Sequence, residues 1–353
     1  MTYRSDGTQI QALPESTDSL IISHTELKIC FDQLAGSLRP AWELGLQESK
    51  QKISFPFRSG HKFETPKIAV HCHVYYLELF RELLSAWKNI QNKFLFITTN
   101  TAFKASIIEQ ILIRNEELDY LVIIVKNRGR DIAPLMYLLK HYLNGFDIVI
   151  HCHTKKSPHV DKGFGVAWRK SMIQATFPNE YLARKLVDLL VNVNAGIAMP
   201  WPHRFVAHNV NWGSNFCRIK SLMELVGFKI NRSNFLYFPA GSFFWARVDA
   251  LQPLLSLSIN DLDFCPEPTP PDGALAHSLE RCIGILPMLE NRRSYAVWID
   301  ANTHGFTDAV NDSHLIALPT NDDLKNNCED WFKDGLVRAF SSYVPAHQSL
   351  IVS

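Results

Sequence analysis

The sequence predicts an α/β protein built on a mostly parallel sheet with helices on both faces. Between residues 66 and 160, short apolar runs alternate with segments whose apolar residues recur at helical spacing, in the order β-α-β-α-β-α-β. Strands separated by helices in this way pair in parallel through right-handed crossovers. Polar and charged residues directly follow the apolar runs, at the sheet edge where open α/β folds bind ligands.

The composition is that of an ordinary globular chain. Its 353 residues suffice for one large or two ordinary domains, and 46% of them are hydrophobic and 20% charged. A formal net charge of +1 provides no global field that would recruit nucleic acid, so we expect no nucleic-acid partner. Seven cysteines at irregular spacing, without a CxxC pair, favour reduced thiols over a disulfide framework.

The chain is expected to act in the cytoplasm. Its N-terminus does not resemble a signal peptide, and no apolar run approaches the roughly 18 residues that a spanning helix needs. Any contact with the inner face of the cell membrane is therefore expected to be peripheral. We predict a partly helical N-terminal extension over residues 1–65, a core domain over 66–305 and a C-terminal, partly helical extension over 306–353.

The first half of the core domain contains four predicted strands, each rich in apolar residues: 67–70, 94–98, 121–125 and 146–150. The predicted helices between them are 76–87, 103–113 and 132–142. A polar turn precedes the third helix, and Asp131 at its end is predicted to cap that helix. Pro134 falls in the first turn, where a missing N–H is tolerated, and Asn144-Gly145 ends the helix.

Beyond residue 160 the pattern is looser. The predicted helices there are 166–175, 181–193, 248–255 and 274–283. Two strands are predicted, over 196–199 and over 235–247, the second with a glycine bend. The stretch 206–218 has no regular period and is rich in Asn, Trp, His and Gly, which is typical of loops that shape a pocket.

Two of the predicted strands run into a His-Cys-His tripeptide, which supplies His71 and His73 in one and His151 and His153 in the other. Residues i and i+2 of a strand share a face, so each tripeptide can offer two imidazoles to a metal ion. In the alternative interpretation, one histidine of each pair packs in the core and the other hydrogen-bonds a loop or a ligand. The absence of a carboxylate at ligand spacing favours this alternative.

Cationic residues gather at the same predicted edge. Arg128 and Arg130 lie in the glycine-containing turn that leads into a helix N-terminus, an arrangement that suits phosphate oxygens. Lys155 and Lys156 follow the next strand, and such groups can neutralise a leaving diphosphate in place of a divalent cation. The alternative is a solvated turn in which Asp131 does no more than cap the helix.

Two acids and several tryptophans are further candidates. Asp272 lies in a proline-rich loop at a helix start, where it can be an N-cap or a general base, and Glu267 is the alternative base. Trp168, Trp212 and Trp245 can stack on sugar faces or pack in the core. The chain contains no G-x-S-x-G, Walker A or G-x-G-x-x-G pattern, which argues against hydrolases and nucleotide kinases.

Six blocks carry a family resemblance: KIAVHCHVYY at 67–76, NRGRDIAP at 127–134, FDIVIHCHTKKSPH at 146–159, AWRKSM at 167–172, FPAGSFFWAR at 238–247 and PDGALAHSLER at 271–281. Together they make the chain resemble the bacterial rhamnan-synthesis F family, glycosyltransferases of cell-surface polysaccharide assembly. The resemblance implies transfer of a sugar, typically L-rhamnose, from a dTDP- or GDP-sugar to a glycan or lipid-linked acceptor. It also implies partner glycosyltransferases in the same assembly system.

More distantly, the layout is similar to the GT-A glycosyltransferase fold, with a nucleotide-sugar half at 66–160 and an acceptor half at 161–305. The donor contacts implied by this likeness are His71, His73, Asn127, Arg130, Asp131, His153, Lys155 and Lys156. The implied acceptor contacts are Trp168, Arg169, Trp212, Gly241, Trp245 and Glu267. Asp272 occupies the place of the base in an inverting transfer.

The likeness departs from the family pattern at one position. Where GT-A enzymes carry a D-x-D metal motif, residues 151–156 read His-Cys-His-Thr-Lys-Lys, so we expect the lysines to replace Mn²⁺ or Mg²⁺. Two other functions stay open from the residues alone. One is a metal-dependent enzyme built on the histidines, and the other is a non-catalytic glycan-binding or scaffolding module of an assembly complex.

Overall fold

The computed structural model describes residues 66–115, 118–156, 162–203, 206, 209–232, 236–297 and 315–318, together with two short strands near the N-terminus. These are β1 (Thr2–Tyr3) and β2 (Gln9–Ile10), which pair antiparallel with each other. The helices predicted for the two terminal extensions lie outside the described residues.

The first half of the core is a parallel β/α unit. Its strands are β3 (Ile68–Val74), β4 (Lys93–Thr99), β5 (Asp119–Ile124) and β6 (Ile148–His153). The helical segments that connect them are η1 (Leu77–Leu79), α3 (Phe80–Ala86), η2 (Trp87–Asn89), α4 (Ala102–Leu112) and α5 (Ile132–His141). The strands pair in the order β6-β3-β4-β5, so α5 carries the chain back across two strands.

The second half extends the same sheet. Its strands are β7 (Ala195–Pro200), β8 (Phe244–Arg247), β9 (Arg293–Val297) and β10 (Leu315–Leu318). Its helical segments are α6 (Lys162–Thr176), α7 (Glu180–Asn192), η4 (Gly213–Asn215), α8 (Phe216–Leu225), α9 (Val248–Leu251), η5 (Gln252–Leu257), η6 (Asp261–Asp263) and α10 (Leu275–Leu289). Within the described residues, none of these helices is long and apolar enough to span a bilayer.

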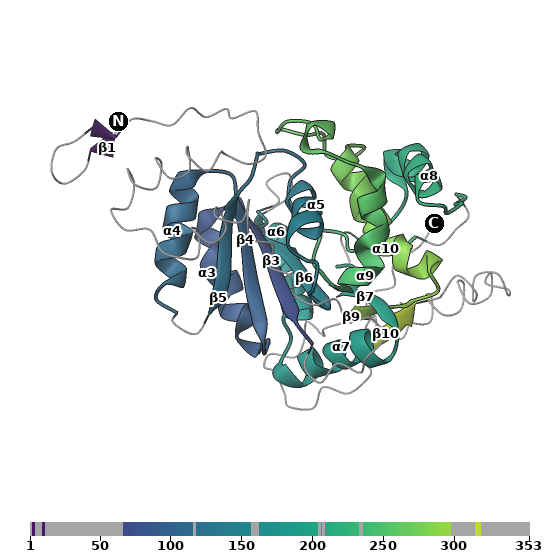
Figure 1. Cartoon of the computed structure of the whole chain (residues 1–353), viewed down its shortest axis with the longest axis horizontal. Helices are drawn as coiled ribbons and strands as arrows, with labels where there is room; N and C mark the ends of the chain where they lie inside the picture. Colours follow the sequence, from purple (N-terminus) through teal and green to yellow (C-terminus); the bar gives the residue numbers. More distant parts are fainter. Residues whose placement is uncertain are drawn as a thin grey trace.

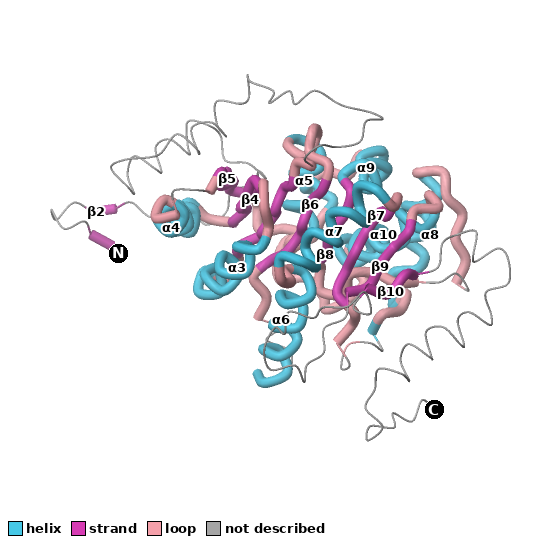
Figure 2. Tube along the Cα trace, turned by 90° about the horizontal axis from the view of Figure 1, so that it is seen from below, coloured by secondary structure: helices cyan, strands magenta, loops and turns pink. Residues whose placement is uncertain are grey.

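Apart from β1 and β2, the described strands form one eight-stranded sheet in the order β10-β9-β7-β8-β6-β3-β4-β5. Strand β8 runs antiparallel to β6 and β7, and β10 runs antiparallel to β9, whereas the other pairs are parallel. Figure 2 shows the strands crossing the molecule from β5 and β4 at one end to β9 and β10 at the other. The predicted mostly parallel α/β sheet flanked by helices is therefore confirmed.

Helices cover both faces of the sheet, and the strand alternation explains why. Along β3, Ile68, Val70 and Cys72 join one hydrophobic cluster together with side chains of α3, α4, α6 and α7. The intervening Ala69 joins a second cluster, which contains side chains of α5, α8, α9 and α10. Figure 1 shows α3 and α4 beside β4 and β5, and α8 and α10 at the other end of the molecule.

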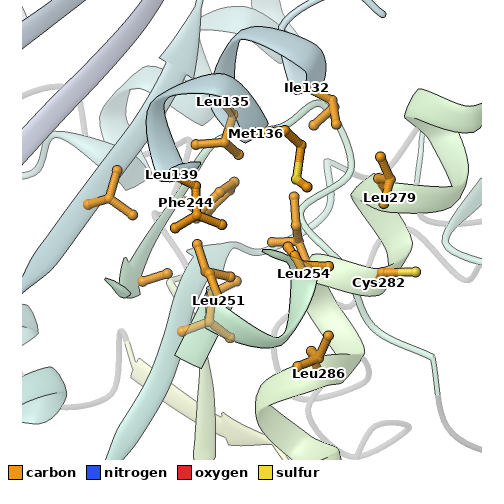
Figure 3. Packing of buried hydrophobic residues seen from close by; sticks show 14 of the residues in the cluster. Ile132, Leu135, Met136, Leu139, Phe244, Leu251, Leu254, Leu279, Cys282 and Leu286 are labelled. Atoms are coloured by element: carbon orange, nitrogen blue, oxygen red, sulfur yellow. The ribbon is translucent and has the colours of Figure 1, made fainter. Parts of the chain in front are cut away.

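The second cluster closes the face on which the candidate site lies. Figure 3 shows side chains of α5, β8, α9, η5 and α10 packing together, among them Ile132, Leu135, Met136, Leu139, Phe244, Leu251, Leu254, Leu279, Cys282 and Leu286. Helix α10 also approaches another segment through a glycine, because a Cβ added at Gly284 would lie 2.4 Å from the Cα of Phe238. This packing fixes α10 against the end of the sheet.

Three predicted elements differ from the structure. Each His-Cys-His tripeptide belongs to its strand instead of following it, because both tripeptides continue the ladder between β3 and β6. The strand predicted over 235–247 begins only at Phe244, after a turn in which Gly241 has φ +100° and Ser242 has φ +58°. Helix α8 and strands β9 and β10 were not predicted, and β10 lies within the predicted C-terminal extension.

Candidate functional site

The carboxyl ends of β3 and β6 flank a topological switch point. From β3 the chain moves through α3 on one face to β4, and it returns through α5 on the other face to β6, on the opposite side of β3. In open α/β sheets the crevice at such a point is where ligands bind. His71 pairs with His151 and His73 with His153, so the two tripeptides lie next to each other and in register.

The imidazoles form one buried chain of hydrogen bonds with Thr98 and Asp131. His73 Nδ1 lies 3.0 Å from Thr98 Oγ1, which lies 3.0 Å from His71 Nε2. His71 Nδ1 lies 2.9 Å from His151 Nδ1, and His151 Nε2 lies 3.1 Å from Asp131 Oδ2. Donation in one direction, from His73 toward Asp131, satisfies every link with neutral imidazoles. The chain therefore ends on the carboxylate of Asp131.

This arrangement corrects the predicted role of Asp131 as a helix cap. Asp131 is the residue before α5, yet its side chain makes no capping hydrogen bond and points to His151 instead. The same geometry affects the alternative of a metal site built on the histidines. The Nδ1 atoms of His71 and His151 are at hydrogen-bond distance from each other, so each is engaged by the other ring. Among the described residues, no group of three or more His, Cys, Asp or Glu side chains is arranged to hold a metal ion.

Burial keeps the rings of His71, His73 and His153 neutral, whereas neighbouring groups keep the carboxylate of Asp131 charged. Burial lowers the pKa of His73 to about 3 and that of His153 to about 4, and it lowers the pKa of His71 well below its ordinary value. Burial alone would raise the pKa of Asp131, but the nearby His153 and the hydrogen bond from His151 hold it below the ordinary value. Asp131 is therefore a buried negative charge close to the neutral rings of His71, His73 and His153.

We expect the fold to lose stability as the pH falls from about 6.5 toward about 4, because unfolded histidines bind protons there and these folded ones do not. Above about pH 6.5 both states are neutral and the stability is complete. Each such histidine adds a slope of up to about 1.4 kcal/mol per pH unit. Urea unfolding at several pH values measures this slope, and His73→Asn should flatten it. A free energy of unfolding that is constant over this range would contradict the neutral buried network.

The turn before α5 is fastened to the loop around η6. Gly129 has φ +62°, and a Cβ there would lie 2.4 Å from the ring of Phe264, so only glycine fits. Lys126 is buried and its Nζ lies 2.5 Å from Asp261, while Arg128 donates to the carbonyl of Phe264 over 3.0 Å. These two cations therefore hold the turn in place and are not available to a ligand.

Arg130 and Asn127 lie on the outer side of this turn, and both are exposed. Arg130 donates from Nε to Thr269 Oγ1 over 3.1 Å and from Nη2 to the carbonyl of Pro270 over 3.1 Å. These two bonds orient the guanidinium, and its other N–H groups make no hydrogen bond within the described part of the chain. The structure thus brings the Arg130 turn against the loop that carries Glu267, whose Oε2 accepts from the N–H of Thr269.

The two adjacent lysines have different environments. Lys156 is exposed, pairs with Glu78 and lies 4.8 Å from the ring centre of Tyr76. Lys155 is half-buried, and its Nζ lies 4.3 Å from the ring centre of Trp168. In the part of the chain that the structure describes, no ion pair or hydrogen bond engages this Nζ, and burial lowers the pKa of Lys155. Lys155 is therefore the lysine with a charge free for a ligand.

Sequence reasoning missed two residues of α10, His277 and Glu280. His277 is 7% exposed, and its Nδ1 accepts from the N–H of Ala274, so the neutral ring carries its proton on Nε2. That Nε2 has no hydrogen-bond partner among the described residues. Burial and the charge of Arg130 lower the pKa of His277 to about 4. A buried N–H donor without a partner is costly, which marks this position for a ligand.

Asp272 is held by its surroundings on both oxygens. Its Oδ1 accepts from Asn215 Nδ2 over 2.7 Å and lies 3.5 Å from Arg281 Nη2, and its Oδ2 accepts from the N–H of Ser214 over 3.1 Å. Partial burial alone would raise the pKa of Asp272, but the bonds from Asn215 and Ser214 hold it below the ordinary value. Helix α10 begins at Leu275, so Asp272 is not its N-cap.

Of the predicted acceptor residues, Glu267 lies in the loop against the Arg130 turn, and the others fall into three locations. Trp168 and Arg169 lie on α6 beside Lys155, where Arg169 pairs with Glu82 over 3.0 Å and contacts the carbonyl of Lys155. Gly241 lies next to them, since a Cβ there would be 2.7 Å from Met172 and 3.2 Å from Trp168.

The other two tryptophans lie elsewhere. Trp212 precedes η4, and its Nε1 donates to the carbonyl of Arg232. Trp245 is 1% exposed in β8, and its Nε1 donates to the carbonyl of Thr176 over 2.6 Å. Because both ring faces of Trp245 lie in the core, its placement does not support the predicted sugar contact.

The fold and the site define an α/β protein with a cluster of polar and charged side chains at the switch point of its sheet. The profile of a protein family described as "Rhamnan synthesis protein F" matches residues 48–292 of the chain. The chain belongs to this family, which confirms the resemblance carried by the six blocks and associates the chain with polysaccharide synthesis.

Two curated relatives, each named "Uncharacterized protein WxcX", come from two strains of Xanthomonas campestris pv. campestris. Each is 32% identical to the chain over 227 residues, which is 63% of this chain and 31% of the relative. The chain thus spans less than half of the length of these relatives.

Proposed function

We propose that the chain is a glycosyltransferase that moves a sugar from a nucleotide-diphosphate donor to a cell-surface polysaccharide or lipid-linked glycan. The sugar that we propose is L-rhamnose. The observation that carries this proposal is a set of unsatisfied hydrogen-bond donors at the switch point. Lys155 Nζ has no ion pair, and the Nε2–H of the buried His277 has no partner, among the described residues. A ligand rich in anionic oxygens satisfies both.

A diphosphate is the ligand that fits this set of groups best. Arg130 lies close enough to Lys155 and His277 for its charge to add to the effect of burial, which lowers the pKa of both groups. Such preorganised donors stabilise the charge that develops on a departing nucleoside diphosphate, which is the role that a divalent cation has in other transferases. We therefore propose donor binding by these residues without a resident Mn²⁺ or Mg²⁺.

The transfer also needs a base for the acceptor hydroxyl and a surface for the sugars. Two acids of the site are candidates for this base. Asp272, which was predicted from the sequence, lies before α10, and Glu280 lies within α10. An inverting displacement uses one such carboxylate. Trp168, beside Lys155, offers a half-buried ring on which a sugar can stack. The proposal also includes a GT-A-like division into donor and acceptor halves. It further includes action at the inner face of the cell membrane and partner glycosyltransferases.

We expect dTDP-L-rhamnose or a GDP-sugar to raise the melting temperature of the protein, since a ligand at about 100 times its dissociation constant adds about 2.7 kcal/mol of stability. Lys155→Ala should weaken donor binding about 10- to 100-fold, because a charge-assisted contact with a phosphate is worth about 1.5–3 kcal/mol. A thermal-shift titration with a panel of nucleotide sugars measures both effects.

The matched control is Lys170→Ala, which removes an exposed lysine from the same helix as Trp168 and should leave the affinity unchanged. Stabilisation by free glycans but by no nucleotide diphosphate would reject the transferase and favour a glycan-binding module. Equal loss of affinity in the two variants would show that only the overall charge matters.

A further inference from the structure

We propose that Glu280, on the inner side of α10, is the general base that takes the proton of the acceptor hydroxyl. This inference rests on the glycosyltransferase function proposed above and assigns one of its chemical roles. Three features carry it: one oxygen of the carboxylate is fixed, the other is unengaged, and the carboxylate is bonded to the turn beside Trp168 and lies within the electrostatic reach of Lys155.

The first oxygen of Glu280 is held by the turn that precedes β8. Glu280 Oε1 accepts from the N–H of Gly241 over 2.9 Å and from Ser242 Oγ over 3.0 Å. The carbonyl of Gly241 in turn accepts from His153 Nε2 over 3.0 Å, so the carboxylate is tied to the carboxyl end of β6. These bonds hold the carboxylate of Glu280 in one orientation through Oε1 and leave Oε2 for another partner, as a positioned base requires.

The second oxygen has no partner of its own. In the described part of the chain, no hydrogen bond or ion pair engages Glu280 Oε2. Lys155, Arg281 and Asp131 are all near enough to act electrostatically on the carboxylate. Burial, followed by the negative charge of Asp131, raises the pKa of Glu280. A carboxylate with a raised pKa is a stronger base, and it still ionises readily beside Lys155.

Asp272 is a poorer candidate for the same role. Both of its oxygens accept hydrogen bonds, and these bonds lower its pKa, so taking a proton would disrupt the contacts with Asn215 and Ser214. Those contacts join the loop before α10 to η4. We therefore assign Asp272 to positioning that loop and Glu280 to the proton transfer.

The chemical step balances with the groups present. The acceptor hydroxyl gives its proton to Glu280 Oε2 while its oxygen forms a bond to the anomeric carbon of the donor. The bond from that carbon to the diphosphate oxygen breaks, and its electron pair leaves on the nucleoside diphosphate, where Lys155, Arg130 and His277 stabilise the charge. The proton on Glu280 then passes to solvent. Water can replace the hydroxyl, so slow donor hydrolysis reports the same base.

The test compares Glu280→Gln with the wild type in hydrolysis of dTDP-L-rhamnose and of a GDP-sugar. Glutamine keeps an oxygen for Gly241 and Ser242 but takes no proton, so we expect turnover to fall about 10²- to 10⁴-fold with donor affinity and melting temperature retained. The wild-type profile of kcat/KM against pH should fall on the acid side, and this limb should be absent in the variant. Glu280→Asp keeps a carboxylate and should retain the acid limb at reduced turnover.

Two further variants separate the outcomes. Glu290→Gln, at the C-terminal end of α10, removes another partly buried acid whose pKa burial raises, yet it faces Arg292 and should leave turnover unchanged. Asp272→Asn should cost less than Glu280→Gln. Turnover of Glu280→Gln within about threefold of the wild type, or an acid limb that survives in it, would reject Glu280 while leaving the transferase intact. Failure of the wild type to bind or turn over any nucleotide sugar would reject the proposed function itself.

Discussion

Trp245→Ala is expected to lower the free energy of unfolding by about 3–5 kcal/mol, the range for removing a fully buried large aromatic side chain. Trp245 is 1% exposed, belongs to the hydrophobic cluster under α3, α4, α6 and α7, and donates to the carbonyl of Thr176. The substitution leaves a cavity and frees a buried carbonyl. Urea unfolding monitored by circular dichroism measures the loss.

The contrast with two other aromatics tests whether Trp245 acts in packing or in sugar binding. Phe103 is 61% exposed on α4, so Phe103→Ala should change stability by about 0.5 kcal/mol or less. Trp168→Ala, at the half-buried ring beside Lys155, should weaken the binding of sugar ligands more than it affects stability. A Trp245 variant that folds as well as the wild type but no longer binds glycans would return Trp245 to the acceptor site.

The burial of Trp245 shows why sequence reasoning misplaced its side chain. Strand β8 lies between β6 and β7 in the middle of the sheet, and Phe243, Phe244, Trp245 and Ala246 are all buried. A strand covered on both faces gives no alternation of apolar and polar residues, so the sequence does not tell which side chain faces a crevice. The antiparallel direction of β8 was equally hidden, because it depends on a long excursion through α6, β7 and α8.

The proposed donor side was more accessible to prediction, because it depends on the local order of strands and helices. Four parallel strands with helices between them bring the carboxyl ends of β3 and β6 to one edge of the sheet. Each tripeptide follows the apolar residues of its strand, and the two tripeptides lie in register. The two lysines that follow could not be ranked from the sequence. Adjacent residues in extended chain point to opposite sides, so Lys155 meets Trp168 while Lys156 pairs with Glu78.

His277 and Glu280 escaped sequence analysis for a different reason. They lie within an apolar helix, three residues apart, where a periodic pattern marks them only as members of one face. Their importance comes from tertiary contacts with the Gly241 turn and with the Arg130 turn, which are distant in sequence. A search for acids and histidines on the buried side of α10 would have found them, since charged and polar residues are uncommon there without a partner.

Asp131→Ala is expected to lower the free energy of unfolding by about 2–4 kcal/mol, the cost of leaving a buried donor without a charged acceptor. Asp131 is 4% exposed and receives the hydrogen bond at the end of the His73-Thr98-His71-His151 chain. Without it, the Nε2–H of His151 has no acceptor. The series of hydrogen bonds from His73 to His151 then no longer ends on a carboxylate. The loss should appear in urea unfolding at about pH 7.5, where the buried rings of His71 and His73 are neutral.

Graded variants separate the hydrogen bond from the charge of Asp131. Asp131→Asn keeps an oxygen for His151 and should lose less stability than alanine, whereas Asp119→Ala, at the exposed start of β5, should change it by about 0.5 kcal/mol or less. If Asp131→Ala unfolds as easily as Asp131→Asn, the charge and not the hydrogen bond stabilises the network. If neither variant differs from the wild type, the carboxylate does not order the imidazoles, and the neutral chain that supports the switch-point site would have to be abandoned.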